Sequence, residues 1–542
     1  MTSQQRQQQQ STERTPLIYS NGHYRGDGHA NADDAADNDL STPPVSTWSL
    51  ILTEAGALVF NSIPTSLGYM LQNSIQTVSV TVLSLKRDDT ALSGAAHGFM
   101  LAMVTAWTLA LGGTTALDSL ASVSYAQSLS PKLSASQARH NREQVGILLQ
   151  RCLIVLFTIF VPVAVLWYNI YPVLLLLDQP PAVAVEVQRF LRVLILGAPG
   201  YILFESLKKF VQVQGDARPP TQALLIAFPL NLGLNWLFIH TLDMGLLGSP
   251  LAVSITYYTS ALLLVIHILF LGRKTSRPGW GGWNPSAALH LRSVLLFTKM
   301  AVSGWIMVAS EWVSFEIVAL VAGSLGEVEL AAQSVIMTMD QCINTLPFGL
   351  GVATSGRIGH LLGLAGDLNP LSVAKLPISA HTAFLVSTVQ GLAIGVPLFI
   401  ARKSFGKLFT DSTAVVKMIA RVMPLVAAFQ VSDGWAQSQG GVLRGIGRHE
   451  VGAAANIVAF YIISLPLGVY LAKGKPQVGL PGLWAAQWLG LTLVGLAEWV
   501  VVWRTNWKKQ VQHADERSQT GRGQGQEDSN GDEAAEVARR AA

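Results

Sequence analysis

Two glutamates, Glu311 and Glu316, lie inside a nearly uninterrupted apolar segment that runs from Ser303 to Gly323. An acidic side chain at bilayer depth costs roughly 2.5–3.5 kcal/mol even on a lenient insertion scale. We therefore expect these carboxyls to face a hydrated cavity or a partner group. A carboxyl in such a place can take a proton from one side of a membrane and release it to the other, so the segment predicts transport.

Glu311 can serve a proton and a cation in turn. Its ionised form attracts a cation at low local dielectric, and protonation removes that attraction and releases the cargo. The coupling comes from mutual exclusion, because each occupant favours opening to one side. A structural carboxyl bonded to a neighbouring helix is the alternative. Glu316 lies about 140° around an ideal helix from Glu311, so either the cavity is wide or Glu316 contributes to packing.

Aromatic and amide side chains near these glutamates are candidates for the wall of a substrate cavity. Trp312 and Phe315 lie between the two glutamates and can stack on a flat cation, or simply pack. Gln72 and Gln76 can bond cargo without a pH response, with hydrogen bonding between helices as the equal alternative.

Other acidic residues also lie in apolar runs. Asp340, near the middle of its run, is a candidate for the proton relay together with Glu311 and Glu316. Asp118, in a stretch of small residues, is expected to be a gate or helix-packing contact. Glu205, with the two lysines that follow it, and Glu498 are predicted to form solvated contacts near membrane surfaces.

The composition places these residues in a membrane protein. Of 542 residues, 50% are hydrophobic and 13% are charged, whereas soluble proteins carry about 25% charged residues. Repeated bilayer spans explain this better than one large core. The net charge of +4 is not gathered into a basic stripe, so no nucleic-acid partner is expected. Cys152 and Cys342 lie in apolar runs and are expected to be small core residues. We expect no metal or cofactor.

The tails at residues 1–46 and 507–542 are polar, contain few apolar residues and are predicted to be disordered. Within the first, Glu13 precedes the pair Leu17 and Ile18 by four residues. This pattern resembles the acidic dileucine signals that sorting adaptors bind on vacuolar and lysosomal membrane proteins. It favours a vacuolar or lysosomal-type membrane, with the plasma membrane as the alternative.

About twelve apolar runs are long enough to cross a bilayer as helices. They cover residues 53–84, 92–127, 145–168, 186–212, 219–240, 247–271, 294–323, 328–362, 376–402, 413–443, 450–472 and 479–503. An even number of spans puts both tails on one side. Lys and Arg follow spans two, four, six, ten and twelve, which marks that side as cytoplasmic. The basic loop after span nine disagrees with this orientation.

The two halves of the chain resemble each other. Gly245 opens span six as Gly479 opens span twelve, and Gly215 ends span four as Gly447 ends span ten, with nearly equal separations. This spacing predicts a duplicated six-span unit, with lobes at residues 47–275 and 276–506 and a substrate site between them.

Several segments together resemble the multidrug and toxin extrusion (MATE) family, in its plant-and-fungus-like branch. Thr115–Ala121 is similar to the family's ALDTL element, and Ser310–Glu316 to its LEWWSFE stretch. Further segments that are similar, in the family's order, are Ala332–Ser334, Pro347–Ala353, Arg357–Gly359, Val442–Gly447 and Trp503–Trp507. Asp118, Arg357 and Arg444 belong to these motifs and are expected in gating or packing. The turn at Leu85–Asp89 and the segment Val123–Gln127 depart from the family pattern and indicate a divergent member.

The resemblance implies two pseudo-symmetric six-helix lobes, all α-helical, that expel small organic compounds, usually cations, in exchange for protons or sodium. Glu311 matches the family's span-seven glutamate by position. A flippase or an organic-anion exporter of the same superfamily is the alternative, but it would favour a cationic cavity. The chain has no HExxH, nucleophile-elbow or P-loop motif, so an enzyme is not expected.

Overall fold

The computed structural model describes residues 47–130, 133–177, 179–271, 279–366, 370–475 and 477–522. Within these ranges the regular structure is helical throughout, and eleven helical segments are long and apolar enough to cross a bilayer. The predicted all-helical membrane fold is confirmed. Glu13, Leu17 and Ile18 lie outside the described residues.

The first half of the chain contains six of these spans. Its elements, which include short π-helical and 3-10 segments (η), are α2 (Thr47–Ser84), α3 (Asp89–Ala102), η2 (Met103–Trp107), α4 (Thr108–Gly113), α5 (Thr115–Gln127), α6 (Ala135–Tyr168), α7 (Ile170–Leu176), α8 (Pro181–Val213), α9 (Arg218–Trp236), η3 (Leu237–Thr241), η4 (Gly245–Leu247), α10 (Gly248–Ile266) and η5 (His267–Leu271). We call the helices α2 to α10 the N-lobe.

The second half contains the other five spans. Its elements are α11 (Pro285–Ala288), α12 (Leu291–Gly323), α13 (Glu327–Ile343), α14 (Thr345–Leu364), α15 (Pro370–Ala401), η7 (Phe405–Leu408), α16 (Thr413–Gly445), α17 (His449–Asn456), η8 (Ile457–Ser464), α18 (Leu465–Lys473), α19 (Leu480–Trp503) and α20 (Trp507–Arg522). We call the helices α12 to α19 the C-lobe.

Local sequence signals fix several helix starts. Asp88 accepts a hydrogen bond from the Ala91 amide and caps α3. Ser134 and Gln137 form a reciprocal capping box at the start of α6. Pro181 opens α8, where its fixed φ suits the first turn and its missing N–H is not needed.

The eighth predicted span, over residues 328–362, is helical but is interrupted at one residue. α13 ends at Ile343 and α14 starts at Thr345, with Asn344 between them. Pro347 lacks the N–H that would bond the Ile343 carbonyl, so a continuous helix loses a bond there. The break directs the Asn344 side chain toward α16, where it donates to Asp433.

The internal repeat is visible in the backbone. Gly215, just after α8, and Gly447, just after α16, both have positive φ, at 93° and 73°. Gly245 and Gly479, which precede α10 and α19, also have positive φ, at 55° and 71°. L-residues with a side chain rarely adopt this conformation, so glycine at matched positions of both halves maintains matched turns.

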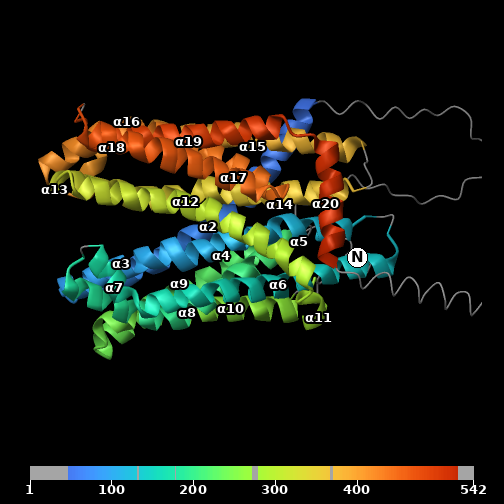
Figure 1. The fold of residues 1–542 in the computed structure, drawn as a ribbon, viewed down its shortest axis with the longest axis horizontal. Coiled ribbons are helices and arrows are strands. Elements are labelled where there is room, and N and C mark those ends of the chain that lie inside the picture. Colours follow the sequence, from blue (N-terminus) through green and yellow to red (C-terminus); the bar gives the residue numbers. More distant parts are fainter. Residues whose placement is uncertain are drawn as a thin grey trace, which may run out of the picture.

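The two lobes form two layers that join along a central set of helices (Figure 1). α3, α6, α8, α9 and α10 lie in one layer, and α13, α15, α16, α18 and α19 lie in the other. α2, α4 and α5 of the N-lobe contact α12 and α14 of the C-lobe. α4 and α12 approach closely because Gly112 and Gly304 face each other; a Cβ at Gly304 would lie 2.4 Å from the Gly112 carbonyl oxygen.

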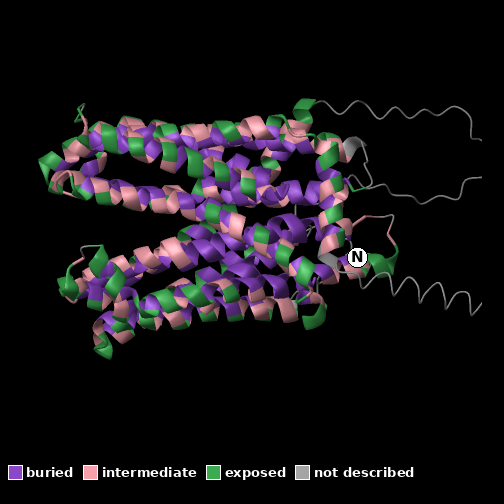
Figure 2. Cartoon of the chain, viewed as in Figure 1, coloured by how far each residue is buried: buried purple, intermediate pink, exposed green. Residues whose placement is uncertain are grey.

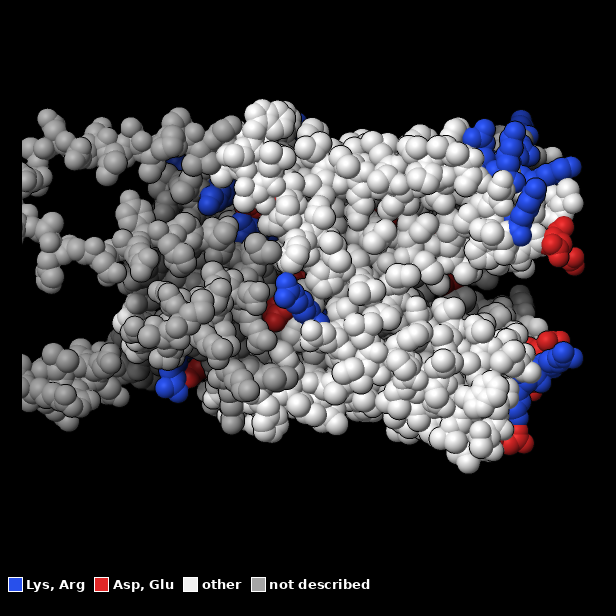
Figure 3. All heavy atoms as spheres, turned by 180° about the vertical axis from the view of Figure 1, so that it is seen from behind, with Lys and Arg blue, Asp and Glu red and all other residues white. Residues whose placement is uncertain are grey.

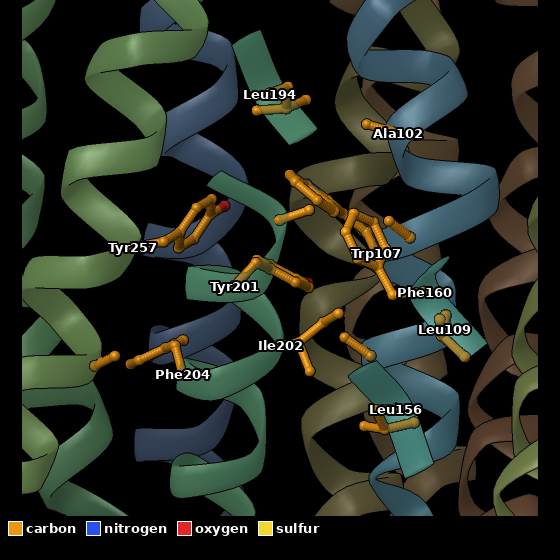
Figure 4. Packing of buried hydrophobic residues seen from close by; sticks show 14 of the residues in the cluster. Ala102, Trp107, Leu109, Leu156, Phe160, Leu194, Tyr201, Ile202, Phe204 and Tyr257 are labelled. Atoms are coloured by element: carbon orange, nitrogen blue, oxygen red, sulfur yellow. The ribbon is translucent and has the colours of Figure 1, made fainter. Parts of the chain in front are cut away.

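Each lobe has its own apolar core, and buried residues follow the inner sides of both layers (Figure 2). In the N-lobe, Trp107 stacks on Tyr201 at 4.4 Å between ring centroids, and Tyr257 meets both rings edge-on (Figure 4). Phe315, Phe429 and Trp484 form the corresponding aromatic group of the C-lobe.

The lobes are closed against each other at the end where α2 begins and α20 lies, which we call the terminal end. Arg357 of α14 donates two hydrogen bonds to the buried Glu54 carboxylate of α2, one of them at 2.9 Å. Nearby, Gly359 of α14 packs on α5; a Cβ there would lie 2.6 Å from the Asp118 carbonyl oxygen. Charge and close packing therefore seal this end.

Helix α20 corrects the prediction that the chain is disordered from residue 507. Val511 and Ala514 are buried in an apolar cluster with residues of α5, α14, α15 and α16. Gln127 of α5 donates to Asp515 at 3.1 Å, and Arg517 donates to the Ile446 carbonyl at 2.7 Å. The helix therefore rests on both lobes at the terminal end.

The far end, opposite α20, is open between the lobes. Figure 3 shows a groove there between the two layers. On the described part of this face, Lys, Arg, Asp and Glu gather toward the two ends and leave an uncharged band between them, as expected for a lipid-facing surface.

Candidate functional site

A pocket in the C-lobe contains polar side chains from three helices, two of which contribute a glutamate. α12 contributes Glu311, α16 contributes Gln437 and Arg444, and α19 contributes Glu498. The apolar part of its lining includes Met307, Val308, Trp312, Phe348, Ala436, Leu491 and Val494. We call it the C-lobe pocket.

Glu311 and Asp433 share an amide donor. The Gln437 Nε2 atom lies 3.3 Å from both Glu311 carboxylate oxygens and 3.4 Å from Asp433 Oδ1. Asn344, at the break between α13 and α14, donates to the second Asp433 oxygen at 2.8 Å. The Gln437 amide thus links the two carboxyls, and in the described part of the chain neither carboxyl forms an ion pair.

Asp340 joins the same region from α13. It is buried and accepts a hydrogen bond from Gln430 of α16 at 3.0 Å. Asp340 and Asn344 lie one turn apart, and both bond to α16, so the end of α13 is fixed to the helix that carries Asp433.

Arg444 is the basic side chain of the C-lobe pocket. It is buried, and its Nη2 atom lies 3.5 Å from the Gln437 carbonyl oxygen, in the pocket that also contains Glu311 and Glu498. Both Glu498 oxygens lack a hydrogen-bond partner within the described ranges. The prediction of a solvated Glu498 is wrong, because its side chain is 1% exposed. The predicted gating or packing role of Arg444 remains a prediction.

A second pocket, the central pocket, lies between the lobes. The N-lobe lines it with Tyr69, Gln72, Asn73, Gln76, Met103, Leu111 and Tyr201, and the C-lobe with Trp312, Asn344, Thr345 and Phe348. Trp312 and Phe348 line both pockets. The acidic group is thus separated from the interlobe space by one layer of aromatic and amide side chains.

Behind the N-lobe wall lies a buried ion pair. Lys208 donates to Glu205 Oε1 at 2.7 Å and to Gln72 Oε1 at 3.2 Å, and Gln72 donates to the same Glu205 oxygen at 2.7 Å. The Lys208 ammonium also lies 3.8 Å from the centre of the Tyr69 ring. This corrects the prediction of a solvated pair, since Glu205 and Lys208 are 0% and 3% exposed.

The next lysine makes a second buried pair. Lys209 donates to both oxygens of Asp118, at 2.9 and 3.1 Å. Asp118 and Arg357 also line a crevice between the lobes near the terminal end. Their placement there agrees with the predicted gate or packing role, which remains a prediction.

The predicted cavity residues separate into two sets. Gln72, Gln76 and Trp312 line the central pocket. Phe315 does not, because it packs on Phe429 and Trp484 inside the C-lobe, which corrects its assignment to the cavity. Glu316 is half-buried and lines neither pocket. Asp433 was missed; its signal was an acid within the apolar run 413–443.

Comparison with known proteins bears on the identity of this arrangement. The MatE family model matches residues 64–237 and 305–470. An uncharacterized transporter of Schizosaccharomyces pombe is 32% identical, over 90% of this chain and 86% of that protein. Multidrug and toxin extrusion protein 1 of Homo sapiens is 31% identical, over 76% of this chain and 68% of that protein.

A solved structure has the same fold. The crystal structure of the eukaryotic MATE transporter AtDTX14 superposes with a TM-score of 0.77 at 25% identity, over 86% of this chain and all of that one. The two segments that the family model matches fall in the two halves of the chain. The chain belongs to the multidrug and toxin extrusion (MATE) family of membrane transporters.

Proposed function

We propose that this protein exports organic cations in exchange for protons by alternating access, and that the carboxyls of the C-lobe bind either the cation or the proton. The observation that carries the proposal is the balance of charge in and beside the C-lobe pocket. Glu311, Asp340, Asp433 and Glu498 are buried or partly buried there, with Arg444 as the cation among the described side chains. The excess negative charge needs either protons or a cation.

Competition follows from the shared amide. Because Gln437 contacts both Glu311 and Asp433, a positive group that approaches Glu311 acts on both carboxyls. Two unit charges about 4 Å apart interact by about 4 kcal/mol at the effective dielectric of a protein surface region. Protons on these carboxyls remove that attraction, so the two occupants exclude each other and their binding is coupled.

Cargo would reach the carboxyls through the central pocket. Trp312 and Phe348 line both pockets and offer aromatic faces and edges to an organic cation. The structure is closed at the terminal end and open at the far end, one of the two states that alternating access requires. The exchange of a proton for cargo would then set which end opens.

We place the terminal end on the cytoplasmic side, because α20 and the start of α2 lie there and most basic loops of the sequence belong to it. Export would then run into a vacuolar or lysosomal-type lumen, or out of the cell if the protein is in the plasma membrane. Replacing Leu17 and Ile18 by alanine and imaging the protein decides whether a sorting adaptor reads Glu13 and this pair.

The test is uptake of a fluorescent organic cation into sealed vesicles under an imposed pH gradient. We expect Glu311→Gln to abolish gradient-driven uptake. Glu316→Gln is the matched control, because it removes a carboxyl from the same helix outside both pockets, and we expect it to retain uptake. Equal uptake by wild type and Glu311→Gln contradicts the proposal. Uptake that only a sodium gradient drives would make sodium, and not the proton, the coupling ion.

A further inference from the structure

The N-lobe wall of the central pocket already holds a cation of its own. The Lys208 ammonium lies over the Tyr69 ring at 3.8 Å and bonds to Glu205 at 2.7 Å. A cargo cation would seek the same two features, an aromatic face and a carboxylate. In this wall both are taken by a side chain of the protein.

The two walls of the central pocket therefore differ in charge. Tyr69 and Gln72 line the pocket, and the neutral Glu205–Lys208 pair lies directly behind them. On the opposite wall Asn344 bonds to Asp433, with Glu311 beyond Trp312. Only the C-lobe wall has negative charge to offer, so the field in the pocket is one-sided.

We propose that Lys208 is a specificity-determining residue: by neutralising Glu205 it makes the transporter discriminate against elongated cargo that carries positive charge at both ends. Such cargo gains attraction at the C-lobe wall but none at the N-lobe wall. Cargo with one charged end and one uncharged aromatic end meets an acidic wall and an aromatic, amide-lined wall. This inference rests on the proposed export of organic cations.

No other described cation replaces Lys208 at this carboxylate. Glu205 Oε2 has no hydrogen-bond partner among the described residues, and Lys209 is held by both oxygens of Asp118. Removing the Lys208 charge therefore leaves Glu205 uncompensated one layer behind the pocket, with the Gln72 amide between them. The wall then becomes attractive to a second positive charge.

The test compares two probes of similar length that differ by one charge, N-methyl-phenylpyridinium and N,N′-dimethyl-bipyridinium, both para-linked. Export of each is measured in vesicles for wild type and Lys208→Gln. We expect the variant to shift the ratio of transport efficiencies toward the dication by about tenfold or more, the effect of one uncompensated charge in a poorly solvated site.

Two further variants separate charge from structure. Lys208→Arg keeps the charge, and Glu205→Gln combined with Lys208→Gln keeps the wall neutral, so both should retain the wild-type ratio. An unchanged ratio in Lys208→Gln, or an equal shift in the neutral double variant, overturns the proposal. Glu205→Gln alone makes the wall positive and must lower dication export more than monocation export. If Lys208→Gln does not fold, the Glu205→Gln variant tests the proposal in its place. Failure of wild type to export the monocation contradicts the proposed function instead.

Discussion

The two lobes share a plan but handle buried charge in opposite ways. In the N-lobe the buried carboxylates of Asp118 and Glu205 each have a lysine partner within hydrogen-bond distance, and the third, Glu54, accepts from Arg357 across the lobe contact. In the C-lobe Glu311, Asp340 and Asp433 are bonded to amides. The two halves thus differ: the N-lobe carboxylates are paired with basic side chains, whereas these C-lobe carboxyls are bonded to amides and remain available.

The physical basis is the cost of desolvation. A buried ion pair contributes little net stability over an apolar pair, but breaking it is expensive because one charge stays buried alone. A carboxyl bonded to an amide can be neutral or ionised without losing its hydrogen bond. The N-lobe therefore resists changes in protonation, and the C-lobe accommodates them.

The largest expected effect is in the N-lobe. Lys209→Met leaves Asp118 buried without its partner, and we expect a loss of about 3–5 kcal/mol in the free energy of unfolding. Thermal unfolding in detergent measures it. The double variant Asp118→Leu with Lys209→Met should recover most of the loss.

In the C-lobe, Asp340→Asn should cost less than about 1 kcal/mol of unfolding free energy, because its amide oxygen still accepts from Gln430. Equal losses in the two lobes would break the comparison.

The second prediction concerns transport and lies in the C-lobe. Asp433→Asn keeps an acceptor for Asn344 but removes the charge. We expect pH-gradient-driven export to fall about 10–100-fold, within the range of typical coupling free energies, with thermal stability retained. Vesicle uptake and thermal unfolding of the same preparation give both values. Retained export would show that Glu311 acts without Asp433.

A smaller effect is expected where the lobes meet. Glu54→Gln removes the charge that holds Arg357 across the terminal end, and we expect the closed state to lose about 1.5 kcal/mol, or roughly tenfold in population. Gly356→Cys is a suitable reporter, because it lines the crevice there and a Cβ meets nothing within 4 Å. Its labelling by a membrane-impermeant thiol reagent, with Cys152 and Cys342 replaced, should rise.

Glu143→Gln is the control for that experiment. Glu143 pairs with the exposed Arg139 outside the interlobe contact, so its loss should leave the labelling of Gly356→Cys unchanged. Equal labelling of the Glu54→Gln variant and its parent would mean that packing alone closes this end.

The smallest effect is at the N-lobe surface. Lys86 forms a surface ion pair with Asp243 and lowers the pKa of that carboxyl by hydrogen bonding and charge. A depressed pKa stabilises the folded state above the usual carboxyl pKa, and this contribution is lost as the pH falls through the depressed value. Lys86→Met should leave the melting temperature unchanged at neutral pH, because exposed pairs contribute little. A clear fall in the melting temperature would mean that the exposed ion pairs of the N-lobe stabilise the fold as its buried pairs do.

Much of the fold could be predicted from the sequence because bilayer spans need long apolar runs, and the matched glycines of the repeat mark equivalent turns. Glu311, Asp340 and Gln72 were identifiable as polar groups within apolar runs. Their partners were not, because pairings such as Gln72 with Glu205 join residues 133 positions apart through tertiary packing. The same limit applies to the break at Asn344.

Charge near a predicted span end was the weakest signal. Glu205 and Glu498 were expected in water, yet both are buried, because the parts of α8 and α19 that carry them pack against neighbouring helices. Residue type could not distinguish a solvated glutamate from one that packs beside a buried lysine or arginine. Phe315 shows the converse, since its type suited a cavity but its face of α12 points into the lobe core.

Helix α20 has a mechanical consequence. It contacts Gln127 on one lobe and the carbonyls after α16 on the other, so it spans the line along which the lobes must part. In the proposed cycle, opening the terminal end has to move this helix away from one lobe, so any contact that holds the helix in place slows that step. In that cycle a peripheral segment outside both pockets would act as a brake on turnover without touching cargo or proton.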